Sequence, residues 1–158
     1  MSSLFGPTTC GYFRLSASIT TFASSTLSVV CVRNASFAVG DAFDRESLAA
    51  TLPRPNVAVV SGLYELFADN KMVLRSIEGV ADALAPGGYF IYTNQPWHPQ
   101  LEMIARVLDN REGRPWVMRC RSQAEMDELA RAAGFEKLEM LIDEGGIFTV
   151  SLARKRAV

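Results

Sequence analysis

The sequence between residues 56 and 99 most constrains how this chain of 158 residues can fold. An unbroken apolar run at 57–60 has the pattern of a strand buried on both faces of a parallel sheet, and it stops at Ser61-Gly62. Apolar residues then recur with helical spacing over 70–84. The turn Pro86-Gly87-Gly88 precedes a second apolar run at 89–92. Strand, helix, glycine-rich turn and strand form one βαβ unit, which predicts a parallel sheet with ligands at the carboxyl ends of its strands.

The residues on either side of this unit predict further helices and strands. Prolines exclude regular structure from the loop at 94–99, and Ser122 with Glu125 forms a capping box that opens a helix. Alternating apolar residues around a Gly-Gly turn at 145–146 predict an antiparallel hairpin at the end of the chain. The predicted elements are a strand at 36–39, a helix at 45–52 capped by Asp44, a helix at 99–108, a helix from Ser122 to Gly134, and strands at 138–142 and 147–153.

The first 32 residues differ from the rest of the chain, because they contain twelve Ser or Thr and one charged residue, Arg14. Three interpretations stay open. The segment is a Ser-rich, acid-poor targeting sequence, or it is folded and contains a β-branched strand at 27–32. In the third interpretation it does not belong to the native domain, as after a misplaced start or a frameshift. We therefore expect an atypical segment over 1–34 and one methyltransferase-like domain, argued below, over 35–158.

Composition excludes several classes of function. The formal net charge of −1 gives no reason to expect nucleic acid or an anionic membrane surface as a partner. No apolar run approaches the roughly 20 residues that span a bilayer. Cys10, Cys31 and Cys120 are scattered and odd in number. That usage predicts free thiols in a reducing, cytoplasmic compartment rather than a disulfide framework, and it predicts no metal site.

Four motifs, taken in order, resemble class I S-adenosylmethionine-dependent methyltransferases. They are GDAFD at 40–44, VVSGLYELF at 59–67, LAPGGYFIYT at 84–93 and the terminal hairpin. The segment QPWHPQLEMIARVL at 95–108, followed by the helix EMDELARAAGF at 125–135, resembles more narrowly a bacterial group of such proteins, some of which are fused to an α/β-hydrolase domain. The resemblance covers about residues 35–155. It implies an α/β fold: a partial Rossmann-like sheet, mostly parallel, with a C-terminal antiparallel hairpin.

The resemblance also implies a cofactor site for S-adenosylmethionine. In that family a Gly-Asp after the third strand lies beside the adenine, so Gly40, Asp41 and Ala42 would line the ring, and Asp41 would accept a hydrogen bond from its amino group. Ser61, Gly62 and Leu63 would pass under the methionine part and the methyl donor. The alternative for Asp41 is that it simply caps the following turn.

Four residues are candidates for the methyl acceptor's side of the site. The resemblance implies that Tyr64 and Glu65 face the acceptor pocket, although Tyr64 can instead be a packing residue and Glu65 a solvated one. His98, the chain's single histidine, is a candidate general base in the loop after the second strand, and Gln95 would orient the acceptor. A lone loop histidine is also commonly a structural hydrogen-bonding residue.

One departure from the family pattern bears on activity. The family binds the ribose and carboxypropyl parts of the cofactor with a glycine-rich turn after its first strand and an acidic residue after its second. Before Ser36 this chain has no G-x-G-x-G and no Asp or Glu. We therefore expect a truncated methyltransferase of doubtful activity that acts, if active, on a small-molecule acceptor and self-associates through an incomplete sheet. The alternative is a non-catalytic binding or scaffold module built on the same fold.

Overall fold

The structure is a computed structural model, and it describes residues 12–14, 18–21, 30–33, 36–38, 40–110 and 113–157. The chain forms two compact units, Met1–Ala42 and Phe43–Val158, which we describe separately. The expected division into residues 1–34 and 35–158 stays a prediction. Within the described ranges, no helix is both long and apolar enough to cross a membrane.

The first unit contains two antiparallel strand pairs. β1 (Tyr12–Arg14) pairs with β4 (Ser36–Ala38), and β2 (Ser18–Thr21) pairs with β3 (Val30–Arg33). The sequence predicted the strands now labelled β3 and β4 but neither of their partners. Residues 27–29 and 39 of the predicted strands, and Cys10, lie outside the described residues.

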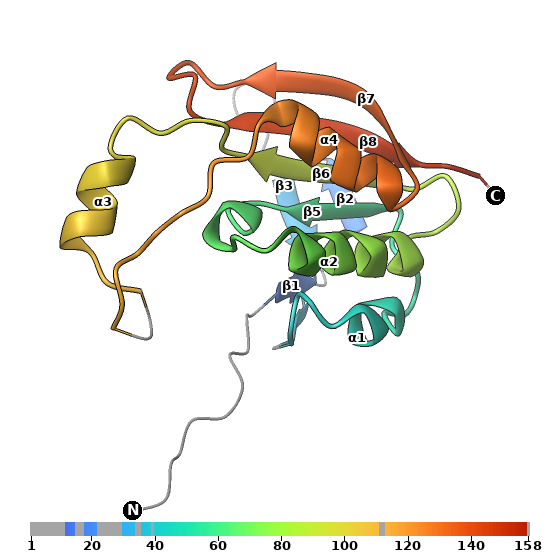
Figure 1. The fold of residues 1–158 in the computed structure, drawn as a ribbon. Coiled ribbons are helices and arrows are strands. Elements are labelled where there is room, and N and C mark those ends of the chain that lie inside the picture. The colour runs from blue at the N-terminus through green and yellow to red at the C-terminus, as the bar shows by residue number, and fades with distance from the viewer. Residues whose placement is uncertain are drawn as a thin grey trace, which may run out of the picture. The chain divides into compact units, whose positions relative to one another are not determined.

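The second unit is built on a four-stranded sheet with the order β5-β6-β8-β7 (Figure 1). β5 (Val57–Val60) and β6 (Tyr89–Asn94) are parallel, whereas β8 (Thr149–Lys155) runs antiparallel to both β6 and β7 (Phe135–Ile142). The predicted βαβ unit and terminal hairpin are thus both present. Their junction is the pairing of β6 with β8, which joins residues far apart in the chain.

Two helices pack on one face of this sheet (Figure 1). α2 (Asn70–Ala83) is capped by Asp69, whose side chain accepts a hydrogen bond from the Lys71 amide, and α4 (Gln123–Ala132) is capped by Ser122 as predicted. Their apolar sides meet alternate residues of the strands, which bury the core. The core residues that are less than 2% exposed are Tyr64, Val73, Ile77, Leu84, Phe90, Tyr92, Met126, Phe135 and Ala153.

The opposite face of the sheet carries exposed apolar side chains, which we call the open face. Val57 and Val59 are 50% and 64% exposed, and Leu141 is 63% exposed. The strand register aligns them with Tyr89, Ile91, Val150 and Leu152. The expectation that 57–60 is buried on both faces is therefore wrong, since the helices of the second unit cover one side alone.

The helix α1 and the strand β7 differ from the predicted elements. α1 (Arg45–Ala49) is shorter than predicted and is capped by Asp44, which accepts hydrogen bonds from the amides of Glu46 and Ser47. α1 lies against α2 where Gly79 leaves room: a Cβ there would lie 2.8 Å from Leu48 Cδ1. In β7 a register shift between Lys137 and Glu139 breaks the alternation that the sequence predicted. Leu138 is consequently 51% exposed.

Candidate functional site

The carboxyl ends of the parallel strands β5 and β6 meet at one edge of the sheet, where the sequence predicted a ligand site. Gly62 follows β5 with a φ of 67°, a left-handed conformation that favours glycine. Its amide donates to Thr93 Oγ1 of β6 at 2.8 Å, which ties the two strand ends together. Among the described residues, a Cβ at Gly62 would meet one atom within 4 Å, Glu65 Oε1 at 3.8 Å. The turn therefore leaves room for a small group beside the Glu65 carboxylate.

The short 3-10 helix η1 (Tyr64–Leu66) follows the turn and buries both residues predicted to face the acceptor. Tyr64 is 1% exposed, and its hydroxyl lies 3.2 Å from Ser76 Oγ on α2. Burial strongly raises the pKa of Tyr64, because the charged phenolate would lose its water. Tyr64 thus packs in the core as a neutral hydrogen-bonding residue, which is the alternative interpretation named for it.

Glu65 is 6% exposed, so it is not the solvated residue that the alternative interpretation described. Burial raises the pKa of its carboxyl, and the nearby Arg121 guanidinium offsets part of that effect. Its Oε2 has no hydrogen-bond partner among the described residues. A buried, unpaired carboxylate oxygen is unfavourable, and such groups are concentrated at functional sites.

Two arginines that the sequence analysis missed hold η1 in place. Arg121 is 1% exposed and donates to Tyr64 O and Phe67 O, both at 2.6 Å, and to Asn70 Oδ1 at 2.7 Å. Arg119 donates to Ala68 O at 2.7 Å and forms an ion pair with Glu125. No local signal marks these residues, because the backbone carbonyls that they bind lie some fifty positions away in the chain.

Gln95 follows β6 and is 3% exposed. Its Oε1, like Glu65 Oε2, has no hydrogen-bond partner among the residues described. The preceding Asn94 donates through Nδ2 to Arg121 O at 3.1 Å. The segment of Arg119 and Arg121 therefore joins the end of β6 to the turn that carries Glu65.

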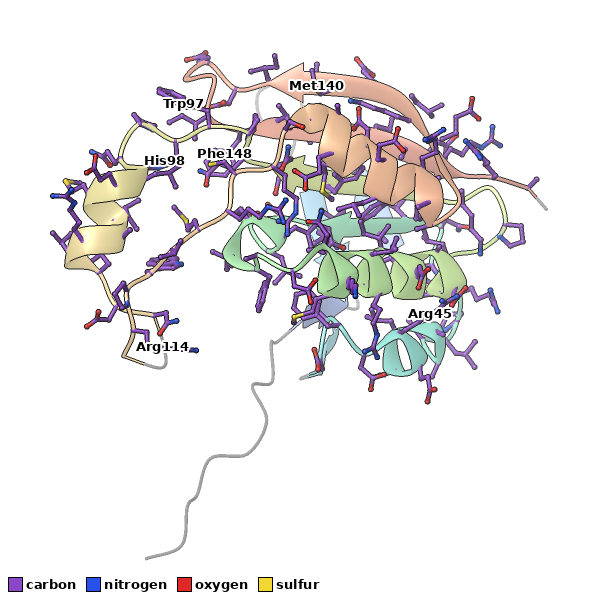
Figure 2. The ribbon with its side chains drawn as sticks, viewed as in Figure 1. Arg45, Trp97, His98, Arg114, Met140 and Phe148 are labelled. Carbon is purple, nitrogen blue, oxygen red and sulfur yellow. The ribbon has the colours of Figure 1, made fainter. Side chains whose placement is uncertain are left out.

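His98 lies in the loop that leads from β6 to α3 (Leu101–Val107), beside Trp97 (Figure 2). It is half-buried, and its Nδ1 accepts a hydrogen bond from the Gln100 amide at 3.1 Å. Trp97 is 55% exposed. The local bond favours the structural alternative for His98, and its role as a general base stays a prediction.

The six predicted cofactor residues fall in both units. Gly40, Asp41 and Ala42 end the first unit, whereas Ser61, Gly62 and Leu63 belong to the second. Ser61 and Gly62 are exposed and Leu63 is half-buried, at the edge just described. The roles of all six stay predictions. Within the described residues, no group of three or more His, Cys, Asp or Glu is arranged to hold a metal ion.

Comparison with known proteins finds a family that matches most of this chain. The sequence profile of a family described as "putative methyltransferase" matches residues 25–155. The uncharacterized protein YnbC of Escherichia coli strain K12 is 61% identical over 121 residues, which are 76% of this chain and 21% of that protein. The chain therefore spans about a fifth of the length of this curated relative.

Several solved structures that resemble this chain are described as methyltransferases. An O-methyltransferase family protein from Burkholderia thailandensis matches 74% of this chain and 34% of its own, with a TM-score of 0.56 and 11% identity. A SAM-dependent methyltransferase from Methanosarcina mazei matches 70% of this chain and 65% of its own, with a TM-score of 0.50 and 21% identity. At these identities the likeness concerns the fold alone, and it confirms the predicted Rossmann-like α/β architecture with its antiparallel hairpin.

Proposed function

Because this chain belongs to the family described as "putative methyltransferase", we propose that it is a domain for S-adenosylmethionine-dependent methyl transfer to a small-molecule acceptor. The single observation that carries the proposal is the edge formed by Gly62, Glu65 and Gln95. There Gly62 and Glu65 follow β5 and Gln95 follows β6, and Glu65 and Gln95 each have one buried side-chain oxygen that lacks a partner among the described residues. This is the edge at which α/β sheets bind ligands.

The residues at this edge fit the cationic end of the cofactor. When bound, S-adenosylmethionine supplies an activated methyl group on a positively charged sulfonium. Glu65 Oε1 lies 3.8 Å from the position of a Cβ on Gly62, so a carboxylate adjoins the space above the turn. We assign the sulfonium end to Ser61, Gly62 and Leu63, and the adenine to Gly40, Asp41 and Ala42. Such a site would act by orienting the cofactor and the acceptor, so it needs no strong base.

The proposal includes a limit on activity. Since the sequence before Ser36 has no glycine-rich turn and no acidic residue, we expect this chain to hold the cofactor with about half of the usual contacts. We therefore propose weak cofactor binding and little turnover by the chain alone. That same lack favours the second candidate function, a non-catalytic binding or scaffold module that keeps the fold.

We also propose a cytoplasmic location and partners limited to small molecules and a second copy of the chain. The Cys120 thiol is free, as suits a reducing compartment. The near-neutral net charge of −1 argues against nucleic acid. The exposed valines of the edge strand β5 would support self-association.

Titration calorimetry of the full chain with S-adenosylmethionine tests the proposal. We expect a dissociation constant above about 100 µM, because half of the contacts are lacking. Asp41→Ala and Gly62→Val are expected to weaken binding at least tenfold, the first by removing the adenine acceptor and the second by filling the turn. Asp82→Ala, which removes a carboxylate from the exposed side of α2, is the matched control. No binding at millimolar cofactor would refute the methyltransferase proposal and favour the scaffold module.

A further inference from the structure

The helix α3 buries none of its side chains. Met103 is 51% and Val107 is 67% exposed, and their spacing of four residues puts them on one side of the helix. Figure 1 shows α3 set apart from the sheet and from the helices α2 and α4 that pack on it. A short helix is marginal in water, and packing of an apolar side normally stabilises it. In the described part of the chain, Met103 and Val107 have no such packing.

The open face of the sheet has the opposite deficiency, because it is an apolar surface that no helix of the second unit covers. The strand register places Val59, Ile91 and Leu152 side by side across β5, β6 and β8, and we call these three residues the apolar row. Val59 is largely exposed, and the other two are half-buried. Ile91 and Leu152 also line a hollow in this face. An apolar sheet face of this kind is a typical site of association.

The exposed side of α3 and the apolar row match in size. The seven residues of α3 make a helix about 10 Å long. The three strands that carry the apolar row span about 10 Å, since neighbouring strands lie about 4.8 Å apart. Met103 has a flexible side chain, of the kind that fills irregular hollows. The helix therefore has the length to cover the apolar row, with Met103 at the hollow.

Charged residues give the contact a direction. Glu139 of β7 is exposed and lies next to Leu152 in the strand register, at one end of the apolar row. It forms no ion pair with any residue that the structure describes. On α3, Arg106 precedes Val107 and pairs with Glu102, but both side chains of that pair are largely exposed, so the pair adds little stability. Arg106 can therefore exchange Glu102 for Glu139 at little cost.

Resting on the proposed function for the identity of the partner, a second copy of the chain, we propose that α3 of one copy packs on the open face of the other. In this contact Met103 and Val107 cover the apolar row, and Arg106 lies beside Glu139. Each copy offers one helix without a sheet and one sheet face without a helix, so the contact joins two unlike surfaces. It buries apolar groups from both copies and pairs opposite charges at the rim.

The contact is small, so the association is weak. Complexes that bury less than about 1,200 Å² are typically weak and transient, and a helix of two turns covers less than that area. We therefore expect a dissociation constant of about 100 µM. At the low micromolar concentrations of spectroscopic experiments the chain is then a monomer with an exposed open face.

Sedimentation velocity of the full chain, over concentrations of about 10 to 500 µM, measures the association. Val59→Lys places a charge on the open face, and Val107→Lys places one on α3. Each is expected to raise the dissociation constant at least about tenfold, because the contact would bury an unpaired charge. Ala132→Lys, on the exposed side of α4, is the matched control and leaves the constant unchanged. Circular dichroism verifies that each variant is folded.

An equal mixture of the two valine variants tests whether the surfaces are unlike. The mixture keeps one natural contact, in which α3 of the Val59→Lys chain meets the open face of the Val107→Lys chain. It is therefore expected to associate at least about fivefold more tightly than either variant alone. A mixture no tighter than its components overturns the inference. Natural association in Val107→Lys also overturns it, because the copies would then pair through like faces or through the edge of β5.

A charge exchange tests the orientation of the helix. Arg106→Glu and Glu139→Arg each bring like charges together, and each is expected to weaken association about threefold at low salt. The double variant restores the opposite pair and should associate as the natural chain does. A double variant weaker than both single variants overturns the assigned orientation.

The result is separable from the test of the proposed function. If S-adenosylmethionine binds but the chain does not associate, or associates regardless of the valine substitutions, this inference fails and the methyltransferase proposal stands. If the variants and their mixture behave as expected but the cofactor does not bind, the methyltransferase proposal fails, and the contact between α3 and the open face belongs to a non-catalytic module.

Discussion

The two faces of the four-stranded sheet differ although the same strands supply both. On the face under α2 and α4, Phe90, Tyr92 and Ala153 are fully buried. On the open face of the same two strands, Tyr89 of β6 is 39% exposed and Val150 of β8 is 40% exposed. Since side chains alternate across a strand, the pattern of residues is apolar on both faces, but the second unit covers only one.

This difference shows that the strands carry apolar residues on both faces, as in a sheet that is buried on both sides. Strands in parallel pairs usually have both faces covered, and an apolar face left in water is a typical site for association. A hollow on the open face is lined in part by Ile91, Leu141 and Leu152. We expect buried and exposed parts of the second unit to differ in solution as they do in the structure.

The largest effect is expected from truncating a residue of the covered face. Phe90 is fully buried and stacks on Tyr92 with ring centroids 4.9 Å apart. Phe90→Ala should lower the free energy of unfolding by about 4 kcal/mol, through lost burial and the cavity left behind. Val59→Ala on the open face should change it by less than about 0.5 kcal/mol. Urea denaturation followed by circular dichroism measures both, and equal losses would mean that the open face is covered in solution.

Two arginines offer the next largest contrast. Arg121 is buried and satisfies two backbone carbonyls, whereas Arg154 is exposed and lies over the Tyr89 ring on the open face, at 5.8 Å. Arg121→Met should cost about 3 kcal/mol, because the carbonyls of Tyr64 and Phe67 lose their donor. Arg154→Met should cost about 0.5 kcal/mol, because its cation–π contact and its 3.3 Å hydrogen bond to Gly87 O are both exposed. Similar losses in urea denaturation would contradict the contrast.

A smaller effect concerns pH. Burial raises the pKa of Glu65 above its value in the unfolded chain, which is about 4.3. The stability that its protonated form contributes is complete below that value and is lost as the pH rises through the folded-state pKa. The Glu65→Gln variant has no carboxyl to ionise at this position and so avoids this loss of stability. The stability of the variant, relative to that of the natural chain, should therefore increase with pH. Glu139→Gln, an exposed residue of the open face, is the control in denaturation series from pH 4 to 8. A difference that is constant with pH would contradict the prediction.

The smallest change in stability is expected for Val59→Lys. The side chain is already 64% exposed, so a charge there should alter the free energy of unfolding by less than about 0.5 kcal/mol. It should nevertheless reduce the binding of an apolar fluorescent dye to the folded chain, because it interrupts the row formed with Ile91 and Leu152. Ala→Lys at position 132, on α4, is the matched control. Unchanged dye fluorescence in Val59→Lys would show that the open face is not what binds the dye.

The order of elements in the second unit could be predicted from sequence, because each depends on local pattern. The caps at Asp44 and Ser122 and the glycine at position 134, with a φ of 91°, fixed helix ends that the structure contains. Burial was less predictable. Val57 has the same apolar character as Phe90, and only the placement of the helices decides which face lies in water.

Sequence reasoning named Glu65 and Gln95 as site residues. It did not predict that each would have a buried oxygen without a partner among the described residues. Glu65 Oε2 and Gln95 Oε1 lack partners among the described residues, whereas the donors of Arg121 bind Tyr64, Phe67 and Asn70. Those contacts join residues about fifty positions apart, so no motif encodes them. For Tyr64, the resemblance implied a place facing the acceptor pocket and packing was the alternative. Its burial and its contact with Ser76 agree with packing.

The pairing of β6 with β8 has a consequence for the speed of folding. Residues 95–148 lie between these central strands, so the middle of the sheet closes only after a long loop has been ordered. The β7–β8 hairpin and the β5-α2-β6 unit each form from nearby residues and can form first. We expect the joining of these two pieces to limit the folding rate, since long-range strand pairing is slow compared with local contacts.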